Sequence, residues 1–197
     1  MLIIGLTGGI ASGKSTIASY MMRHHVPVFD SDKAVHKLLG PKGAAIPQIV
    51  ARFGDVGDDI SGIDRAKLGR KVFADTKELG ALEAILHPMV QDSRAKMVKL
   101  ARMRRCKAVV CDIPLLFETK ADKECDVTVM AWAPDFLIRQ RALRRPHMTQ
   151  EKLAQIMARQ MSYHERAKLA DERIATGLGR GAMSANLHKL FKKWHLR

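Results

Sequence analysis

The segment Gly8–Thr16 combines the residue types that proteins use to hold a chain of phosphates. It reads Gly-Gly-Ile-Ala-Ser-Gly-Lys-Ser-Thr and fits the pattern G-x-x-x-x-G-K-[ST]. Gly8 and Gly13 permit backbone torsions that other residues resist, so the loop can wrap a phosphate with its N–H groups turned inward. Lys14 supplies a mobile cation for the β- and γ-phosphates, and the Ser15 hydroxyl is a ligand for Mg²⁺. The segment therefore predicts a site for a nucleoside triphosphate.

The residues on either side of this loop fit the same interpretation. An apolar run over Leu2–Leu6 predicts a buried strand before the loop, and Lys14–His24 has helical character after it. The positive end of that helix dipole favours a bound anion, so a glycine-rich turn without a ligand is the weaker alternative. We expect eight residues to hold the nucleotide: Gly8, Gly9, Ala11, Ser12, Gly13, Lys14, Ser15 and Thr16.

Carboxylates at the ends of two apolar runs are candidates for acid–base and metal chemistry. Asp30 ends the expected strand Val26–Asp30, Asp32 follows closely, and Asp112 comes directly after the apolar run Ala108–Cys111. Strand ends line the ligand crevice of a doubly wound sheet, so Asp32 lies near the phosphate loop if the two strands are close neighbours. We expect Asp32 to be the base for an acceptor hydroxyl, with a position in the cap or first turn of a helix as the alternative. Asp112 fits the pattern of a carboxylate that holds Mg²⁺ through water.

Clustered arginines form a second candidate for phosphate chemistry. Arg139, Arg141, Arg144 and Arg145 lie within seven residues. Arg141 and Arg145 are four positions apart, so they would share one face of a helix. Exposed arginines usually face only water, but four such close cations repel one another unless an anion lies among them. We therefore expect Arg141 and Arg145 to act in a lid over the transferring phosphates, and which phosphate each contacts stays open.

The base-reading motif of switch GTPases, N-K-x-D, cannot occur in this chain. The sequence contains one asparagine, Asn186, and Leu187 follows it. The segment 59–62 fits D-x-x-G, but no plausible strand precedes it, so we interpret it as a chance match. These observations favour a kinase, which needs a base for the acceptor hydroxyl and cations for the transferring charge.

Further strands and helices are expected around these candidate residues. Two more buried strands are predicted over Ala108–Ile113 and Val127–Trp132 by their β-branched content. Residues 44–104 hold several helical stretches and no convincing strand, and residues 134–170 return to helix with a break near Pro146. Strands separated by helices predict an α/β fold, with a parallel sheet flanked by helices on both faces.

The expected organisation is a single P-loop kinase domain. The long helical stretch between the second strand and Ala108 predicts an inserted helical lobe, and the arginine cluster predicts a small lid. We expect the domain to cover residues 1–197, with a core at about 1–40, 105–135 and 165–197, the lobe at about 41–104 and the lid at about 136–164.

Composition narrows the choice of partner and compartment. The net charge of +14, from 34 basic and 20 acidic residues, fits either a nucleic acid or a small polyanion such as a nucleotide. Aromatic residues make up 5% of the chain, too few for a base-stacking surface, so we expect no nucleic-acid partner. No apolar run reaches membrane-spanning length, so we expect no membrane partner. Three cysteines without paired spacing indicate reduced thiols in a cytoplasmic protein.

Taken together, the motifs resemble those of the dephospho-coenzyme A kinases, part of the nucleoside monophosphate kinase-like P-loop group. The phosphate loop alone is not specific to that family, whereas the His-Pro pair and the D-x-P-L-L-x-E segment are specific in combination. The matching residues follow the family's order and span residues 3–174: Ile4–Thr16, Val28–Asp32, His87–Val90, Asp112–Glu118, Arg141, Arg145, Thr149, Gln160, Arg166 and Ala170–Asp171.

The resemblance implies that the γ-phosphoryl group of ATP, with Mg²⁺, is transferred to the ribose 3′-hydroxyl of dephospho-coenzyme A. The product would be coenzyme A, in the last step of its biosynthesis. The resemblance also implies that the inserted helical lobe binds the acceptor. The implied catalytic residues are Asp32, Lys14, Arg141 and Arg145, with Ser15 and Asp112 at the metal. The implied acceptor-side residues are Asp32, His87, Asp112, Leu115, Leu116 and Glu118. Among these, the two leucines would form an apolar wall, and the glutamate would close the site or cap a helix.

Several positions leave alternatives open. A His-Pro pair also suits a histidine packed at a helix end, with Pro88 starting the next helix. Ala11 stands where the family often has Gly, which narrows the options of the loop only slightly. Residues 174–178 lack the Asn that the family tends to place there, so contacts to the nucleotide base stay unassigned. The basic helix expected over residues 180–197 has no assigned chemistry.

Two rival functions remain. A kinase of the same build could act on a nucleoside, nucleotide or shikimate-like acceptor, and it would differ at the helical lobe rather than at the phosphate loop. A basic, nucleotide-dependent nucleic-acid-binding protein would instead bind its partner with a steep salt dependence.

Overall fold

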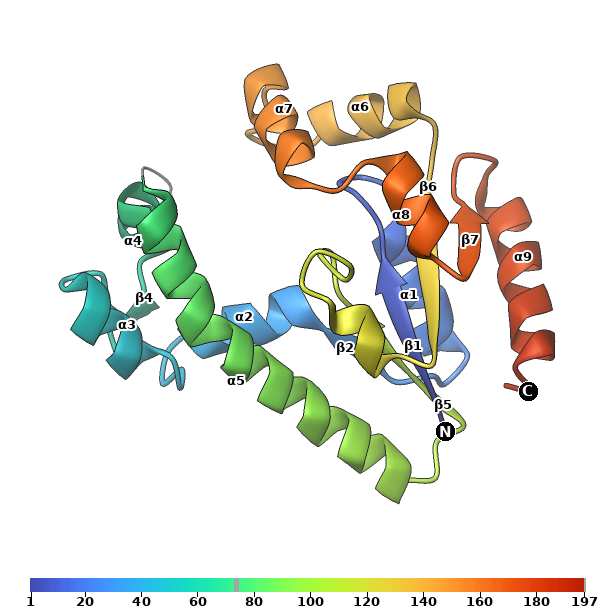
Figure 1. Cartoon of the computed structure of the whole chain (residues 1–197), viewed down its shortest axis with the longest axis horizontal. Coiled ribbons are helices and arrows are strands. Elements are labelled where there is room, and N and C mark those ends of the chain that lie inside the picture. The colour runs from blue at the N-terminus through green and yellow to red at the C-terminus, as the bar shows by residue number, and fades with distance from the viewer. Residues whose placement is uncertain (73–74, 197) are drawn as a thin grey trace. The chain divides into compact units, whose positions relative to one another are not determined.

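A five-stranded sheet organises the larger part of the chain, whose computed structural model describes residues 1–72 and 75–196. The strand order is β2-β5-β1-β6-β7, and the pairs of β1 with β5, β1 with β6 and β6 with β7 are parallel (Figure 1). The strands are β1 Leu2–Thr7, β2 Val28–Asp30, β5 Ala108–Asp112, β6 Val127–Trp132 and β7 Glu172–Ala175. Every residue of β5 is buried, as expected for a central parallel strand that has both faces covered.

Two compact units divide the chain, and each is described by itself. The core unit comprises residues 1–29 and 100–197, and the helical unit comprises residues 30–99. The helical unit thus begins before the boundary expected near residue 41, so the helix that follows β2 joins it.

The helices of the core unit cover the sheet and extend beyond it. They are α1 Lys14–Arg23, α6 Asp135–Leu143, α7 Gln150–Arg159, α8 Tyr163–Leu169 and α9 Arg180–Lys193, with a short 3₁₀ helix over Ala121–Glu124. Ile17 and Met21 of α1 join Leu187 and Phe191 of α9 in one buried cluster with Ile4 of the sheet. The expected basic C-terminal helix is therefore present, and its apolar side completes the core. Figure 1 shows α6 and α7 beyond the carboxyl ends of the strands.

The helical unit has its own apolar core. Its elements are α2 Ser31–Leu39, α3 Ile46–Phe53, β3 Gly57–Asp58, β4 Gly62–Ile63, α4 Arg65–Val72 and α5 Thr76–Met103, the last of which continues into the core unit. Ile49 and Val56 are fully buried in a cluster that also contains Phe53, Leu68 and Leu86. A separate cluster of this kind allows residues 30–99 to keep their fold by local packing.

Two strand regions were missed by the sequence prediction. β7 escapes the apolar pattern because only Ile174 among its four residues is buried, as suits an edge strand that pairs on one side. The antiparallel pair β3–β4 has only two residues in each strand, which is too short to show periodicity. The D-x-x-G segment 59–62 forms the turn of this hairpin and the first residue of β4, so that match follows a strand after all, in the helical unit.

The His-Pro pair does not lie at a helix end. Pro88 is inside α5, whose 28 residues continue through it, so the expectation of a helix starting there is wrong. His87 and Pro88 are both exposed, so a packed histidine is also excluded in this structure. Proline removes one backbone hydrogen bond, and on an exposed helix face water can bind the carbonyl group that loses its partner.

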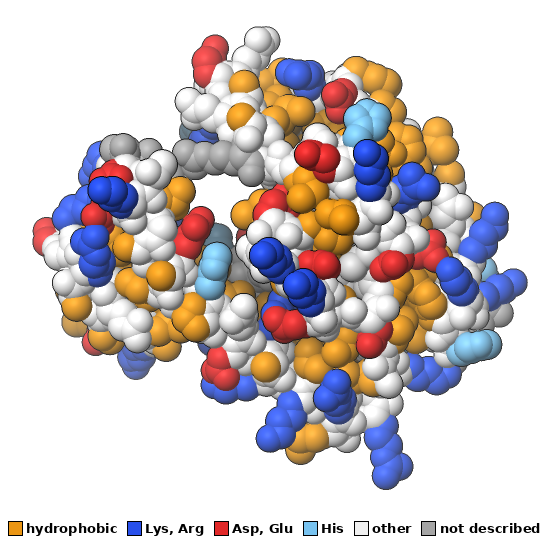
Figure 2. Space-filling model, in the orientation of Figure 1, with side chains coloured by type: hydrophobic (Ala, Val, Ile, Leu, Met, Phe, Trp, Pro, Cys, Tyr) orange, Lys and Arg blue, Asp and Glu red, His pale blue; other side chains and the backbone are white. Residues whose placement is uncertain are grey.

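On the face shown in Figure 2, Lys and Arg side chains are scattered among acidic and apolar ones rather than gathered in one patch. Among the described residues, no helix is both long and apolar enough to cross a membrane. Cys106, Cys111 and Cys125 are all thiols, as expected.

Candidate active site

The phosphate loop connects β1 to α1 through a tightly packed turn. Gly13 has φ 91°, a left-handed conformation that favours glycine, and it directly precedes α1. A Cβ atom on Gly8 would lie 2.5 Å from the Ser12 hydroxyl and 2.9 Å from the carbonyl oxygen of Ala131. Both glycines of the motif are therefore required by the shape of this turn, as the sequence predicted.

Ala11 also takes a left-handed conformation, with φ 55°. For a residue with a Cβ atom this conformation costs about 1–2 kcal/mol, so the alanine found where the family often has glycine is not a neutral replacement. Its methyl group packs in a small apolar cluster with Ala142 and Leu153. That packing contributes stability which offsets part of the backbone cost.

Lys14 and Asp112 form an ion pair, although 98 residues separate them in the sequence. Asp112 ends β5 and lies opposite Leu6 of β1, which places its carboxylate at the edge of the sheet where the loop begins. Both side chains are largely shielded from water, with exposed fractions of 15% for Lys14 and 8% for Asp112. The structure thus brings together the cation predicted to hold phosphates and the carboxylate predicted to hold a metal.

The residues predicted to hold Mg²⁺ offer the oxygen donors that this ion prefers. Ser15 is exposed on the first turn of α1, and Asp112 is the ion-pair partner of the preceding residue, Lys14. Among residues 1–72 and 75–196, no cluster of three or more His, Cys, Asp or Glu side chains could form a complete metal cage. One hydroxyl and one carboxylate suit Mg²⁺, which usually keeps waters and substrate phosphates as its other ligands.

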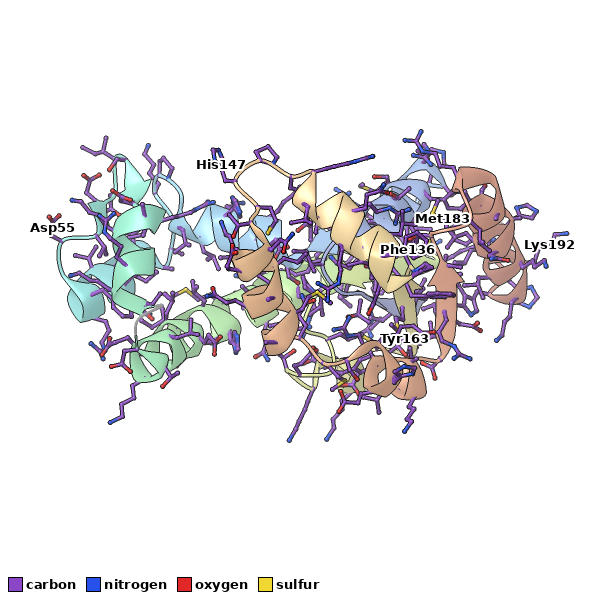
Figure 3. All side chains as sticks on the ribbon, turned by 90° about the horizontal axis from the view of Figure 1, so that it is seen from above. Asp55, Phe136, His147, Tyr163, Met183 and Lys192 are labelled. Carbon is purple, nitrogen blue, oxygen red and sulfur yellow. The ribbon has the colours of Figure 1, made fainter. Side chains whose placement is uncertain are left out.

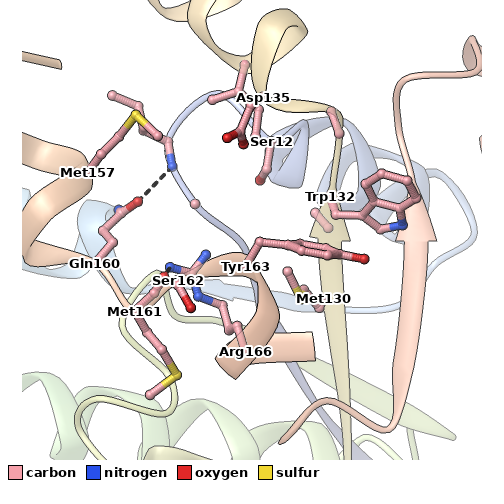
Figure 4. A pocket seen from close by; sticks show the side chains of 15 residues that line it. Ser12, Met130, Trp132, Asp135, Met157, Gln160, Met161, Ser162, Tyr163 and Arg166 are labelled. Atoms are coloured by element: carbon pink, nitrogen blue, oxygen red, sulfur yellow. Dashed lines mark hydrogen bonds between the residues drawn. The ribbon is translucent and has the colours of Figure 1, made fainter. Parts of the chain in front are cut away.

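The loop is held from outside by the segment that joins α7 to α8. The side-chain oxygen of Gln160 accepts a hydrogen bond from the amide of Ile10 at 3.0 Å (Figure 4). Arg166 lies on the same side, since a Cβ atom on Gly9 would be 3.1 Å from its Nη1. Gln160 and Arg166 belong to the resemblance, but the sequence assigned them no role. Gln160 and Ile10 are 150 residues apart in the sequence, so no local sequence pattern could have predicted this contact.

Arg166 places a shielded positive charge beside the loop. It is 3% exposed, and its Nη2 donates to the carbonyl of Met161 at 2.5 Å and lies 3.8 Å from Glu118 Oε1. Burial lowers the pKa of the Arg166 guanidinium, and the Glu118 carboxylate acts in the opposite direction. Glu118 also accepts a hydrogen bond from the Met161 amide at 3.0 Å, so this residue supports the linker and caps no helix.

A pocket of about 100 Å³ lies between the loop, the end of β6 and this linker. Figure 4 shows Ser12, Trp132, Gln160, Tyr163 and Arg166 around it. Small-molecule sites have volumes of roughly 300–1,000 Å³, so this pocket alone is smaller than such a site. Within the described residues, Ser12 Oγ and Arg166 Nε are buried without a hydrogen-bond partner.

The two arginines expected in the lid lie in different surroundings. Helix α6 ends at Leu143 and Arg144 is its C-cap, so Arg145 lies beyond the helix and the prediction of one shared helix face is wrong. Arg141 is half-buried and donates to the hydroxyl of Thr176 at 3.2 Å and to its carbonyl at 2.9 Å. Arg145 is exposed in the connection between α6 and α7, where Figure 3 also shows His147.

Of the two leucines predicted to form an apolar wall for the acceptor, only Leu115 is exposed. Leu115 is 38% exposed, whereas Leu116 is fully buried, and its Cδ2 would lie 3.0 Å from a Cβ atom on Gly5. Leu116 therefore packs on the sheet and cannot face an acceptor in this conformation. Leu115 and Leu116 lie in a turn outside the strands and long helices, so no periodicity in the sequence shows which of the two side chains packs on the core.

The remaining predicted residues lie in the helical unit. Asp32 is exposed in the first turn of α2, and the N-cap of this helix is Asp30, whose carboxylate accepts a hydrogen bond from the Lys33 amide at 2.9 Å. Asp32 therefore has the first-turn position that was one of the alternatives for it, and the cap is Asp30. His87 is exposed on α5. The roles of Asp32 and His87 in catalysis and acceptor binding stay predictions.

Comparison with known proteins gives a consistent family assignment. Residues 2–177 match the family model described as dephospho-CoA kinase. A dephospho-CoA kinase of Rhodospirillum rubrum is 46% identical over 178 residues, which cover 90% of this chain and 84% of the relative. One of Gluconobacter oxydans is 43% identical over 198 residues and covers 98% of both chains.

Solved structures agree with the fold. The crystal structure of TT1252 from Thermus thermophilus has a TM-score of 0.83 at 30% identity, with 98% of this chain and 96% of that chain covered. A dephospho-CoA kinase from Campylobacter jejuni has a TM-score of 0.72 at 23% identity over 97% and 96% of the two chains. A shikimate kinase from Bacteroides thetaiotaomicron shares the fold alone, with a TM-score of 0.53 at 12% identity over 98% of both chains.

Proposed function

The chain belongs to the dephospho-CoA kinase family, and on this premise we propose that it transfers the γ-phosphoryl group of ATP to the ribose 3′-hydroxyl of dephospho-coenzyme A. The products are coenzyme A and ADP, and the reaction is the last step of coenzyme A biosynthesis. The observation that carries the proposal is the family match over residues 2–177, supported by the pairing of Lys14 with Asp112 at the phosphate loop.

The donor is held by the loop and its lysine. Backbone N–H groups of Gly8–Thr16 bind the phosphates, and the dipole of α1 adds a partial positive charge at the same place. Lys14 is paired with Asp112, so we expect Lys14 to exchange this carboxylate for phosphate oxygens when ATP binds.

Ser15 and Asp112 are the residues that would hold Mg²⁺. The ion, when bound, neutralises charge on the β- and γ-phosphates. The chain itself contributes a hydroxyl oxygen and a carboxylate oxygen at positions fixed by α1 and β5.

The acceptor is activated by Asp32. In the proposed step the 3′-hydroxyl gives its proton to the Asp32 carboxylate, its oxygen forms a bond to the γ-phosphorus, and the bond from that phosphorus to the bridging oxygen breaks to release ADP. We assign acceptor contacts to His87, Asp112, Leu115 and Glu118 on the strength of the resemblance, and we leave Leu116 out because it is buried.

The residues around α6 and α7 form the lid. Arg145 is exposed and free to move toward the transferring phosphates, while Arg141 starts from its contacts with Thr176. A lid that excludes water prevents wasteful hydrolysis of ATP. The acceptor is a small molecule rather than a nucleic acid, and the cytoplasm, where thiols stay reduced, suits the three cysteines.

The test is a panel of acceptors. The protein is incubated with ATP, Mg²⁺ and either dephospho-coenzyme A, CMP, UMP or shikimate, and products are analysed by mass spectrometry for the addition of one phosphate. We expect kcat/KM for dephospho-coenzyme A to exceed the others by orders of magnitude, with the phosphate on the ribose 3′-oxygen. Comparable turnover of CMP, UMP or shikimate would overturn this acceptor and leave a P-loop kinase of another specificity.

A further inference from the structure

Thr176 follows β7 and contacts the phosphate loop through several atoms. Its hydroxyl lies 2.5 Å from the carbonyl oxygen of Ser12, in a contact that is buried, and 3.2 Å from the carbonyl oxygen of Trp132. A hydroxyl has one proton, and the shorter distance assigns it to Ser12. The backbone amide of Thr176 donates to the Trp132 carbonyl at 2.8 Å, which extends the pairing of β7 with β6 by one more bond. The threonine is buried, with 7% of its surface exposed. Because its backbone is bonded to β6, its position is set by the sheet rather than by the loop.

The direction of this hydrogen bond determines how the loop presents its N–H groups. In a trans peptide the C=O and N–H groups point in opposite directions. When the Ser12 carbonyl points outward to Thr176, the amide hydrogen of Gly13 must point the opposite way, into the concave side of the loop. Rotation of that peptide would turn a carbonyl oxygen toward the phosphates, and an anion would be repelled.

The side chain of Thr176 also restricts Gly13. A Cβ atom on Gly13 would lie 2.7 Å from the Thr176 hydroxyl, 2.8 Å from its Cβ and 2.9 Å from its methyl group. Gly13 has φ 91°, so the position before α1 is fixed by its own backbone and by the threonine packed against it. The hydroxyl of Thr176 therefore binds Ser12, and the side chain of the same threonine packs against the next residue, Gly13.

The same threonine receives Arg141 from α6. The guanidinium donates to the Thr176 hydroxyl at 3.2 Å and to the Thr176 carbonyl at 2.9 Å. A hydroxyl has one proton to donate and lone pairs that accept, so it can accept from Arg141 while it donates to Ser12. When a hydroxyl oxygen accepts a hydrogen bond, the hydrogen bond that this hydroxyl donates becomes stronger. The bond from Arg141 therefore strengthens the bond from Thr176 to the loop.

We propose that Thr176 is a positioning residue for the donor: its hydroxyl holds the Ser12–Gly13 peptide in the phosphate-binding orientation and transmits the state of Arg141 to the loop. The proposal deepens the proposed function and rests on it for the identity of the nucleotide. A purely structural alternative is that the hydroxyl only satisfies the carbonyl groups of Ser12 and Trp132. The two differ in whether nucleotide affinity or folding stability responds when the hydroxyl is removed.

The test compares variants that differ in the hydroxyl. Thr176→Val keeps the shape of the side chain and removes the hydroxyl. Thr176→Ser keeps the hydroxyl and removes the methyl group, and Thr176→Ala removes both, so these two variants differ only in the hydroxyl. The Kd for ATP·Mg²⁺ is measured by calorimetry without any acceptor, and Tm is measured on the same samples. We expect Thr176→Val and Thr176→Ala to raise the Kd about tenfold, the range of one hydrogen bond, while the Kd of Thr176→Ser stays within about threefold of that of the unchanged protein. If Thr176→Val fails to fold, the comparison of Thr176→Ser with Thr176→Ala decides the question.

A double-mutant cycle tests the link to Arg141. If the guanidinium acts through the hydroxyl, Arg141→Ala should raise the Kd for ATP·Mg²⁺ less in the Thr176→Val background than in the unchanged protein. Equal Kd values for Thr176→Ser and Thr176→Ala would overturn the positioning role. So would a lower Tm of Thr176→Ala with an unchanged Kd for ATP·Mg²⁺. Because these measurements use no acceptor, their outcome does not depend on whether dephospho-coenzyme A is the acceptor.

Discussion

The core unit and the helical unit hold their candidate site residues in different ways. In the core unit, Lys14 is paired with Asp112, and Arg141 is bound to Thr176. In the helical unit, Asp32 and His87 are exposed on the surfaces of α2 and α5. Lys14, Asp112 and Arg141 are therefore ordered by contacts within the protein, whereas Asp32 and His87 present their side chains to water.

This difference has a consequence for stability and activity. Replacing a residue that is ordered by internal contacts removes both a catalytic group and part of the fold, so kcat and Tm should fall together. Replacing an exposed residue away from caps and cores usually changes stability by less than about 0.5 kcal/mol. An exposed residue that serves the reaction should therefore lower kcat while Tm stays the same.

Asp32→Asn is expected to have the largest effect. It keeps the shape of the side chain and removes the charge, so kcat should fall by about 10²–10⁴, with a modest change in the KM for ATP. Tm should stay the same because Asp32 is exposed and Asp30 provides the cap of α2. The measurements are steady-state kinetics and thermal denaturation of the purified variant.

Asp30→Ala is the matched control for this prediction. It removes the cap that the structure places on α2, so it should cost about 1 kcal/mol of stability. If Asp32→Asn kept full activity per folded molecule, Asp32 would leave the mechanism and the base would have to be Asp30 or Asp112.

Lys14→Ala should combine a kinetic and a structural effect. Loss of the cation at the β- and γ-phosphates should lower kcat by about 10²–10³. It also removes the lysine partner of Asp112, which is 8% exposed, so Tm should fall as well. Turnover close to that of the unchanged protein would show that this loop is not the catalytic one, and an unchanged Tm would show that the ion pair contributes little.

Arg145→Ala tests the lid. A charge-assisted contact to a phosphate contributes about 1.5–3 kcal/mol, so kcat should fall about 10–100-fold. Tm should not change because Arg145 is exposed. Arg139→Ala, an exposed arginine on α6, is the matched control and should retain its activity. ATP hydrolysis without acceptor should be slow, and a hydrolysis rate equal to the kinase rate would contradict a closing lid.

Two carboxylates allow a smaller, pH-dependent comparison of the units. The Thr128 hydroxyl and amide hold the pKa of Asp171 below its usual value, and the amide and hydroxyl of Ser61 do the same for Asp58. A lowered pKa in the folded state adds stability above the unfolded pKa, near 3.9, and this stability is lost as the pH falls through the folded pKa. Asp171 joins segments 43 residues apart, whereas Asp58 bonds only within its own turn.

Asp171→Asn should therefore lower Tm more than Asp58→Asn at pH 7. For Asp171 we expect a fall of about 2–4 °C, which should shrink as the pH is lowered below about 4. Thermal denaturation of both variants across pH 3–7 measures it. An equal effect of the two substitutions, or one that grows at acidic pH, would contradict the idea that long-range contacts in the core unit carry more of the stability.

The sequence alone determined the parts of this protein that depend on neighbouring residues. The phosphate loop is recognisable because its glycines, lysine and hydroxyls are contiguous, and the buried strands over 108–113 and 127–132 are recognisable as apolar runs. The resemblance in residue order was sufficient to name the family. Each of these signals is local, or is a series of local signals in a fixed order.

The tertiary structure decided which distant residues act on one another. The partners of Lys14, Arg141 and Gln160 lie 98, 35 and 150 residues away in the sequence, and no periodicity connects such positions. The structure also decided between close alternatives, since Asp30 and not Asp32 caps α2, and α5 continues through Pro88. These outcomes depend on packing and solvent exposure, which arise only when the chain has folded and which local residue types do not encode.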